Sequence, residues 1–294
     1  MRKLCHRVTA DEDGRRLGAL LTGAMGLSQH RVSSLKFSGG IRLDGQNAHT
    51  GVTVHAGQTV EILLTDGPAD LIPYDLPLFL PYRDQDLLIV DKPAPLPAIH
   101  SARQDERTLE NAVYAALGCP ADFCYRPVSR LDKGTSGLMP VALNAPMHAW
   151  MQKLLHTPDY AREYLAVVEG APPREAGICD APIGHGEGVR RVVTPTGKPC
   201  RTHYRILEQS QGRSLLWLRL DTGRTHQIRV HMAHLGCPVA GDGLYGAPLP
   251  ELPGRFALHS ARLAFTHPLT GERIVLESPL PEALRGLLTQ EIAP

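Results

Sequence analysis

Residues 126–142 read RPVSRLDKGTSGLMPVA, and we expect the rest of the chain to be organised around this stretch. The apolar run at 138–143 predicts a strand. A tight polar turn precedes it and contains a single acid, Asp132. Gly134 and Gly137 allow the backbone to turn sharply there and to approach a ligand closely.

Two cations flank Asp132, namely Arg130 and Lys133. Positive neighbours favour an ionised carboxylate, and a carboxylate on a rigid turn is suited to act as a nucleophile or as an electrostatic stabiliser. The structural alternative is a surface loop with a local ion pair, because acids in ordinary ion-pair networks have similar neighbours. The turn is therefore a candidate site, and other parts of the sequence are needed to distinguish a functional carboxylate from a surface ion pair.

The composition is that of an ordinary soluble globular protein, with 294 residues of which 43% are apolar and 21% charged. This length accommodates one large domain and a small one. No segment approaches the roughly 20 apolar residues of a membrane span, and residues 1–16 lack the apolar core of a secretory signal. We therefore expect a cytoplasmic protein without a membrane segment.

The spacing of cysteine and histidine argues against a metal site. The six cysteines form no Cys-x-x-Cys pair, and the fourteen histidines include no His-Glu-x-x-His sequence. We expect reduced, mostly packed thiols and no bound metal.

Positive charge is concentrated near the N-terminus. The formal net charge of the chain is only +1, but residues 1–42 contain eight basic and three acidic residues, a net +5. Clustered cations of this kind bind nucleic-acid phosphates, or they are simply solvated at the surface.

Residues 14–65 have the pattern of a small domain. Two short helices are expected in 14–37, and residues 39–64 alternate glycine turns with short β-prone runs. Two such helices carrying basic side chains, followed by strands, resemble the S4 RNA-binding domain. The resemblance implies that these cations hold RNA phosphates without reading sequence. The cations are Arg15, Arg16, Arg31 and Lys36.

Residues 66–76 are rich in proline and predict an extended linker, after which residues 77–294 form one larger domain. Residues 170–200, rich in glycine and proline, predict a long irregular excursion in it. The regular elements expected in the larger domain are strands at 87–90, 138–143, 160–170, 201–208 and 214–221 and helices near 108–117, 147–155 and 226–235.

The last of these helices carries a candidate functional cation. Ile228, Met232 and Leu235 form its apolar stripe, with Thr225 as a possible cap. Arg229 lies about 100° from that stripe, where its guanidinium can reach a carboxylate beside the sheet. The structural alternative is a partly buried arginine that only supports packing.

Three stretches together resemble the motifs of RluA-type pseudouridine synthases. They are SRLDKGTSGL at 129–138, REYLAVVEG at 162–170 and TGRTHQIRVHMAHLGCPVAGDGLYG at 222–246. The segment ALHSARLAFTHPLTGE at 257–272 is similar to the closing segment of that catalytic domain. The resemblance covers about residues 77–294, behind the S4-like part.

The resemblance implies an α+β fold, in which a catalytic domain built on a mixed, mostly antiparallel sheet follows a small S4-like domain. It implies isomerisation of uridine to pseudouridine in structured RNA, without a cofactor or metal. Asp132 matches the catalytic aspartate of the family, Tyr164 the tyrosine that packs on the target base, and Arg229 the arginine that pairs with the aspartate. Arg130 matches the arginine that fills the stack once the base has left.

Two positions depart from the family pattern. Ser129 stands where histidine is usual, and Arg162 stands where lysine is usual. The first change bears on RNA-strand contacts or base extrusion, and the second keeps the charge.

The chemistry leaves two routes open for breaking the C1′–N1 bond and forming C1′–C5. An ionised Asp132 can attack C1′ or stabilise an oxocarbenium ion, or it can remove the 2′-proton and form a glycal. A bidentate Arg229 would orient the carboxylate under either route. Ile228 or Val230 is expected to form the wall opposite Tyr164, while Arg224, Thr225 and His226 are expected to order the motif.

Two other functions fit parts of this pattern. A non-catalytic RNA-binding or ribosome-assembly factor would keep the fold without turnover, and a small-molecule glycosidase would need a second carboxylate about 5–10 Å from Asp132. For a synthase, the S4-like part favours ribosomal RNA over transfer RNA. We expect a monomer, since RNA supplies the large interface.

Overall fold

The computed structural model describes residues 2–27, 29–37, 39–64, 71–100, 107–210 and 212–289. The side chain of Arg31 lies outside this description. No helix in these ranges is long and apolar enough to cross a bilayer.

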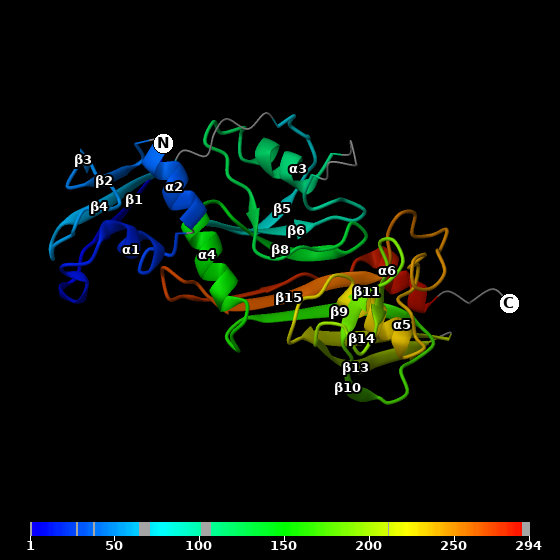
Figure 1. The fold of residues 1–294 in the computed structure, drawn as a ribbon. Coiled ribbons are helices and arrows are strands. Elements are labelled where there is room, and N and C mark those ends of the chain that lie inside the picture. Colours follow the sequence, from blue (N-terminus) through cyan, green and yellow to red (C-terminus); the bar gives the residue numbers. More distant parts are fainter. Residues whose placement is uncertain are drawn as a thin grey trace.

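The N-terminal part forms a sheet and core of its own (Figure 1). Its antiparallel strands follow the order β1-β4-β2-β3, and two helices cover them. Leu17 and Leu21 of the first helix and Ile62 of β4 are fully buried in this core. The bounds are β1 (Arg2–Arg7), η1 (Ala10–Glu12), α1 (Leu17–Thr22), α2 (Gln29–Phe37), β2 (Ile41–Leu43), β3 (Gln46–Asn47) and β4 (Thr59–Leu64).

Strand β1 lies before residue 14, where the sequence pattern placed the start of this unit. It pairs along its whole length with β4, from Arg2 opposite Leu64 to Arg7 opposite Thr59. Local sequence did not reveal it because RKLCHR has few apolar side chains, and it becomes a strand through pairing with β4, which lies more than fifty residues further along the chain.

The predicted linker falls partly outside the described residues, which resume at residue 71. From there the chain has no regular structure up to β5, as its prolines predict. It is not detached, however, because Leu71, Tyr74 and Leu76 pack against the large core and Asn111 donates a side-chain hydrogen bond to the carbonyl of Ile72.

The larger part is built on a sheet of ten strands in the order β10-β13-β14-β9-β15-β8-β6-β5, with β16 beside β15 and β7 beside β8. Only the β8–β15 pair is parallel among these neighbours, so the predicted mixed, mostly antiparallel sheet is confirmed. Its strands are β5 (Phe79–Arg83), β6 (Leu87–Lys92), β7 (Arg126–Pro127), β8 (Ser136–Ala142), β9 (Ala161–Glu169), β10 (Ala176–Asp180), β13 (Arg201–Ser210), β14 (Arg213–Leu220), β15 (Leu258–Thr266) and β16 (Arg273–Glu277).

Helices cover both faces of this sheet. Side chains along β6 alternate between the two faces, so they show which helices lie on each face. Leu88 and Val90 pack in the core that includes α3, α5 and α6, whereas Leu87 and Ile89 pack with Met147 of α4. The helical elements are α3 (Leu109–Ala116), α4 (Ala145–Leu154), α5 (Gln227–His234), α6 (Glu282–Arg285) and η2 (Gly286–Leu288).

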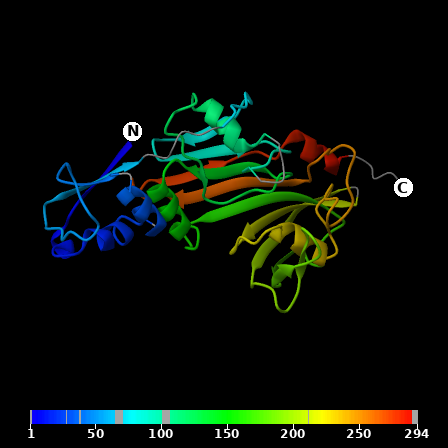
Figure 2. The same ribbon diagram turned by 45° about the horizontal axis from the view of Figure 1, so that its top comes forward.

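The N-terminal part lies at one end of the molecule beside α4, as Figures 1 and 2 both show. Gly26 approaches the Trp150 side chain of α4 closely. Trp150 is only half-buried, whereas Met151 next to it is fully buried in the sheet's core. The helix therefore uses the face that carries Trp150, and not its buried face, at this contact.

The predicted irregular excursion at 170–200 contains regular structure. Besides β10 it forms a two-stranded hairpin of β11 (Ile183–His185) and β12 (Arg191–Val193). Glycine and proline mark the turns correctly, but strands of three residues are too short to show an apolar period.

A register through three strands sets the position of the predicted motifs. Gly137 at the start of β8 lies opposite Ser260 of β15, and Ser260 lies opposite Tyr164 of β9. The turn that carries Asp132 ends just before β8. This register therefore brings the Asp132 turn beside Tyr164.

Gly137 makes the parallel pairing possible. It has φ +106°, and a Cβ at this position would overlap the backbone of Ser260. Both the conformation and the close approach require glycine.

We predict that Gly137→Ala destabilises the protein by about 1–3 kcal/mol more than a matched control, because overpacking is added to backbone strain. The control is Gly271→Ala, since Gly271 also has positive φ (+72°) but an added Cβ would meet nothing within 4 Å. Urea denaturation of both variants measures the difference. Equal destabilisation by the two substitutions would contradict the role of close packing at Gly137.

Candidate active site

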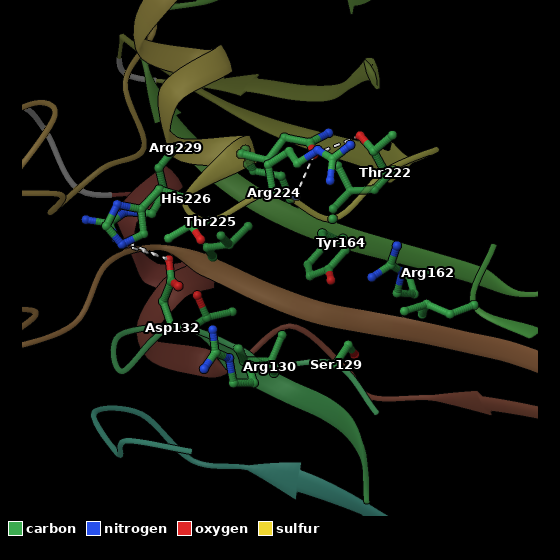
Figure 3. Close-up of a pocket in the computed structure, with 18 of the residues that line it drawn as sticks. Ser129, Arg130, Asp132, Arg162, Tyr164, Thr222, Arg224, Thr225, His226 and Arg229 are labelled. Carbon is green, nitrogen blue, oxygen red and sulfur yellow. Dashed lines mark hydrogen bonds and ion pairs between the residues drawn. The ribbon is translucent and has the colours of Figure 1, made fainter. Parts of the chain in front are cut away.

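A pocket of about 320 Å³ opens where the Asp132 turn, β9 and the segment leading into α5 meet (Figure 3). This volume lies at the lower end of the range of about 300–1,000 Å³ typical of small-ligand sites. Five of the residues predicted from sequence line it, namely Arg130, Asp132, Tyr164, Ile228 and Arg229. The tertiary structure therefore brings together side chains from three separate motifs.

Asp132 and Arg229 are in direct contact across this pocket. Nη1 of Arg229 donates to Oδ2 of Asp132 at 3.1 Å. The Asp132 side chain is 29% exposed and that of Arg229 only 8%. The carboxylate is thus accessible from the pocket, while the cation that orients it is buried.

The fork of the Arg229 guanidinium, which is the pair of N–H groups on Nε and Nη2, is directed at a different acid, Asp242. Nε and Nη2 donate to the two Asp242 oxygens at 2.6 and 2.8 Å. The expected bidentate pairing with Asp132 is therefore wrong, since Asp132 receives a single N–H. Asp242 was not singled out in the sequence because it lies thirteen residues away, in a turn after α5.

Aromatic rings enclose the Arg229 guanidinium. Its central carbon lies 4.3 Å from the ring centroid of Phe256 and 5.0 Å from that of Tyr245. Burial opposes the charge, but the hydrogen bonds and charge of Asp242 outweigh it and raise the pKa of Arg229. Arg229 is therefore a fixed, permanently charged group.

Tyr164 forms part of the pocket lining from β9, as predicted (Figure 3). It is buried and packs in the large hydrophobic core, so one part of the ring supports the fold and another borders the pocket. Burial raises the pKa of Tyr164, so its hydroxyl stays protonated at neutral pH.

His226 begins α5 and faces the same space. It is the N-cap of the helix and has φ +58°, a left-handed conformation that is strained for a residue other than glycine. Its Nε2 lies 4.0 Å from Oδ2 of Asp132, and its Nδ1 lies 2.8 Å from the Tyr245 hydroxyl. The expectation that Thr225 caps this helix is wrong, because the cap position is one residue later.

Lys92, at the end of β6, supports the Asp132 turn through hydrogen bonds to backbone carbonyl groups. It is fully buried, and its Nζ donates to the carbonyls of Leu96 at 2.8 Å, Pro93 at 3.0 Å and Lys133 at 3.4 Å. Burial lowers the pKa of Lys92 to about 7, against the attraction of Asp132. A lysine that closes an apolar run was the only sequence signal for this role.

The two residues that depart from the family pattern also line the pocket. Ser129 precedes Arg130 in the turn, and Arg162 comes from β9 two residues before Tyr164. Arg162 is buried, with its guanidinium carbon 5.8 Å from the centroid of the Tyr160 ring. It therefore also has a packing role.

Other predicted site residues lie elsewhere. Val230 does not line the pocket but packs with Ile183 and Cys200, because it is on another side of α5 from Ile228. Of the N-terminal cations, Arg15, Arg16 and Lys36 are exposed. Arg31 lies on α2, and its side chain is outside the described part.

No cluster of three or more potential metal ligands occurs among the residues that the structure describes. Arg229 in the pocket pairs with Asp132, which also lines it, and with the buried Asp242, which does not. The site therefore offers a carboxylate, a buried cation and an aromatic ring for chemistry on an organic substrate.

Comparisons with known proteins identify the family to which this chain belongs. A family model described as RNA pseudouridylate synthase matches residues 86–234. The solved structure "Human RNA Pseudouridylate Synthase Domain Containing 1" is similar with a TM-score of 0.58 and 26% identity, covering 69% of this chain and 83% of that one.

Curated relatives extend the similarity over nearly the whole chain. "Ribosomal large subunit pseudouridine synthase D" of Xanthomonas campestris is 38% identical over 94% of this chain and 88% of the relative. The protein of that name in Pseudomonas aeruginosa is 36% identical over 89% of this chain and 87% of the relative. The chain therefore belongs to the RluA-type family of RNA pseudouridine synthases. It is an isomerase that acts on uridine in RNA.

We predict that Lys92→Met changes how stability depends on pH. The folded-state pKa of about 7 lies below the ordinary 10.5, so between these values the unfolded state binds more protons. The free energy of unfolding of the wild type, relative to the variant, should therefore rise with pH through this window. The slope is at most about 1.4 kcal/mol per pH unit.

Urea denaturation at pH 7, 8 and 9 measures this difference. Lys153→Met is the control, since Lys153 is an exposed lysine on α4 and its substitution should give a flat difference. A flat difference for Lys92→Met as well would show that its buried amine does not lose its proton in this range.

Proposed function

We propose that this synthase uses Asp132 as its catalytic residue and modifies uridines of ribosomal RNA. The observation that carries the proposal is the accessible Asp132 carboxylate, oriented by Arg229 in a pocket that Tyr164 borders. The carboxylate acts at C1′ of the target nucleotide, either by attack on C1′ or by stabilising its oxocarbenium character. Removal of the 2′-proton by the same group is the other route.

Arg229 orients Asp132 without being able to take its proton. Its guanidinium is held by the Asp242 fork, so only one N–H is directed at the catalytic carboxylate. The second oxygen of Asp132 is then available to the sugar. Because the cation is enclosed by aromatic rings, it acts in a region from which water is largely excluded.

Tyr164 and Arg130 receive the everted nucleotide in this proposal. Turning a base out of an RNA stack costs a few kcal/mol, and stacking on an aromatic ring contributes about 1–3 kcal/mol per base. The buried ring of Tyr164 supplies such a surface, with Ile228 on the helix side of the pocket. Arg130 is exposed at the pocket and fills the space left in the RNA.

The names of the relatives support ribosomal RNA of the large subunit as the substrate, with transfer RNA as the second candidate. The proposed enzyme works as a monomer in the cytoplasm. The alternative of a non-catalytic RNA-binding factor is disfavoured because Asp132, Arg229 and Tyr164 are all present at one pocket.

The N-terminal unit, predicted as residues 14–65, is proposed to be an S4-like RNA-binding domain. Its own buried core and the exposed cations Arg15, Arg16 and Lys36 support this role. These cations contact phosphates and so position the RNA without specifying the target uridine.

We predict that Asp132→Asn lowers pseudouridine formation by at least about 10³-fold, as expected when a nucleophile or an equivalent charged group is removed. Single-turnover assays on ribosomal RNA fragments, with chemical detection of pseudouridine, measure the rate, and filter binding measures affinity. The affinity should change little. The control is Asp75→Asn, an exposed acid away from the pocket. Normal turnover by Asp132→Asn would refute the proposed mechanism.

We predict that the triple variant Arg15→Gln, Arg16→Gln, Lys36→Gln binds RNA more weakly and with a smaller salt dependence. Neutralising a cation that pairs with a phosphate reduces the slope of log K against log salt by about 0.7–0.9. A matched variant that neutralises the exposed Arg174, Arg205 and Arg285 keeps the overall charge equal. Identical slopes for the two variants would show that the N-terminal cations do not contact phosphates.

A further inference from the structure

His226 is held at the pocket by a hydrogen-bond chain that leads away from the substrate space. The backbone N–H of Arg191, at the start of β12, donates to the Tyr245 hydroxyl at 2.8 Å. The same hydroxyl lies 2.8 Å from Nδ1 of His226. The two rings are 5.7 Å apart and nearly perpendicular, which keeps Nδ1 pointed at the hydroxyl.

This series of hydrogen bonds bears on which imidazole nitrogen of His226 carries the hydrogen. The Tyr245 oxygen already accepts from a backbone N–H, which cannot act in the opposite sense, so its own hydrogen is available for Nδ1. In this arrangement the Tyr245 hydroxyl donates to Nδ1, and a neutral imidazole then carries its hydrogen on Nε2.

The imidazole is also neutral. Burial lowers the pKa of His226, and Arg229 and Arg191 act in the same direction, while Asp132 and Asp242 oppose them. A neutral ring with its hydrogen on Nε2 is a hydrogen-bond donor of fixed direction. It faces the pocket, where its side chain is 15% exposed.

The nearest acid does not use this donor. Nε2 is 4.0 Å from Oδ2 of Asp132, beyond the distance of a hydrogen bond. Under either proposed route the Asp132 carboxylate lies beside C1′ or the neighbouring C2′ of the sugar, and the base is attached to C1′. A donor so close to the carboxylate is therefore within reach of the carbonyl groups of the uracil.

The reaction creates an acceptor at this place. When the C1′–N1 bond breaks, its electron pair stays with the uracil, and the negative charge is shared among N1 and the two carbonyl oxygens. When C1′–C5 forms, the base supplies the electron pair of the new bond. The C5 proton then leaves to water or buffer, and N1 takes up a proton from water or buffer, which gives the neutral product. A fixed donor stabilises the charged intermediate more than the neutral starting base.

We propose that His226 is a further catalytic residue of this synthase, whose Nε2–H donates a hydrogen bond to a carbonyl oxygen of the departing uracil, and that Tyr245 is its positioning residue. No proton is transferred by His226 in this role. The strained backbone at His226 is consistent with the role of a hydrogen-bond donor, since the left-handed conformation directs the ring into the pocket at the start of the helix. The inference rests on the proposed role of Asp132.

The test uses the full-length protein with RNA that carries tritium at C5 of the target uridine, because the C5 hydrogen is released as product forms. Single-turnover rates with enzyme in excess report the chemical steps, and filter binding reports RNA affinity. The variants are His226→Ala, His226→Gln, Tyr245→Phe and the double variant His226→Ala with Tyr245→Phe. His234→Ala is the control, since His234 is exposed on the same helix and lies outside the pocket.

We expect His226→Ala to lower the single-turnover rate by roughly 10²–10³-fold, the effect typical of removing one such donor, with RNA affinity nearly unchanged. His226→Gln should recover at least part of the rate, because its amide N–H can replace Nε2–H. Tyr245→Phe should lower the rate by less than His226→Ala. The double variant should be no slower than His226→Ala, because Tyr245 acts through the imidazole.

Asp132→Asn, measured in parallel, separates this inference from the proposed function. If Asp132→Asn is inactive while His226→Ala turns over like the wild type, the inference is overturned and the role of Asp132 stands. If Asp132→Asn is active, the proposed function itself fails. A folded His226→Gln variant as slow as the alanine variant, or rate effects that multiply in the double variant, would also overturn the donor role.

Discussion

The site depends on the way Arg229 divides its hydrogen bonds between two acids. A buried guanidinium is costly without partners, and removing one partner of such a pair typically costs about 3–5 kcal/mol. Asp242 satisfies the fork of Arg229, and the remaining N–H is directed at Asp132. Asp132 can therefore stay accessible to the pocket without leaving the cation unpaired. Asp242 holds the Arg229 guanidinium in place, whereas Asp132 is the acid proposed to act on the substrate.

The large sheet determines where these groups meet. The register from Gly137 through Ser260 to Tyr164 places the Asp132 turn beside the aromatic ring. Lys92 ties the same turn to the end of β6 through the carbonyl of Lys133. The turn is thus attached to two strands rather than to one. Catalytic groups need this kind of support, because small displacements cost large factors in rate.

The pocket contains both charged and neutral hydrogen-bond donors. Arg229 carries its charge at Asp132, whereas Tyr164 and His226 are kept neutral because burial raises the pKa of the one and lowers that of the other. In the proposed reaction Arg229 keeps a full positive charge at the carboxylate, while Tyr164 and His226 contact the base as uncharged groups. A base that is held by stacking and neutral hydrogen bonds is able to rotate after it has detached from the sugar.

Local sequence was sufficient for the strand β6, for helix α5 with Arg229 on its flank and for the strand that carries Tyr164, because periodicity and turn residues act over a few positions. The roles predicted for Asp132 and Tyr164 came from the resemblance to a family. Local sequence was insufficient for β1, which is a strand only through pairing with β4, and for the β11–β12 hairpin. From the sequence, Val230 was expected to line the pocket, but it packs elsewhere. The bidentate hydrogen bonds of Arg229 were expected at Asp132, but they are made to Asp242. The partnership with Asp242, the support from Lys92 and the link from His226 to Tyr245 join residues whose proximity comes from the assembled sheet and its loops. A pattern along the chain records which side chains share a face, but only the tertiary structure decides which distant side chains come within hydrogen-bond distance.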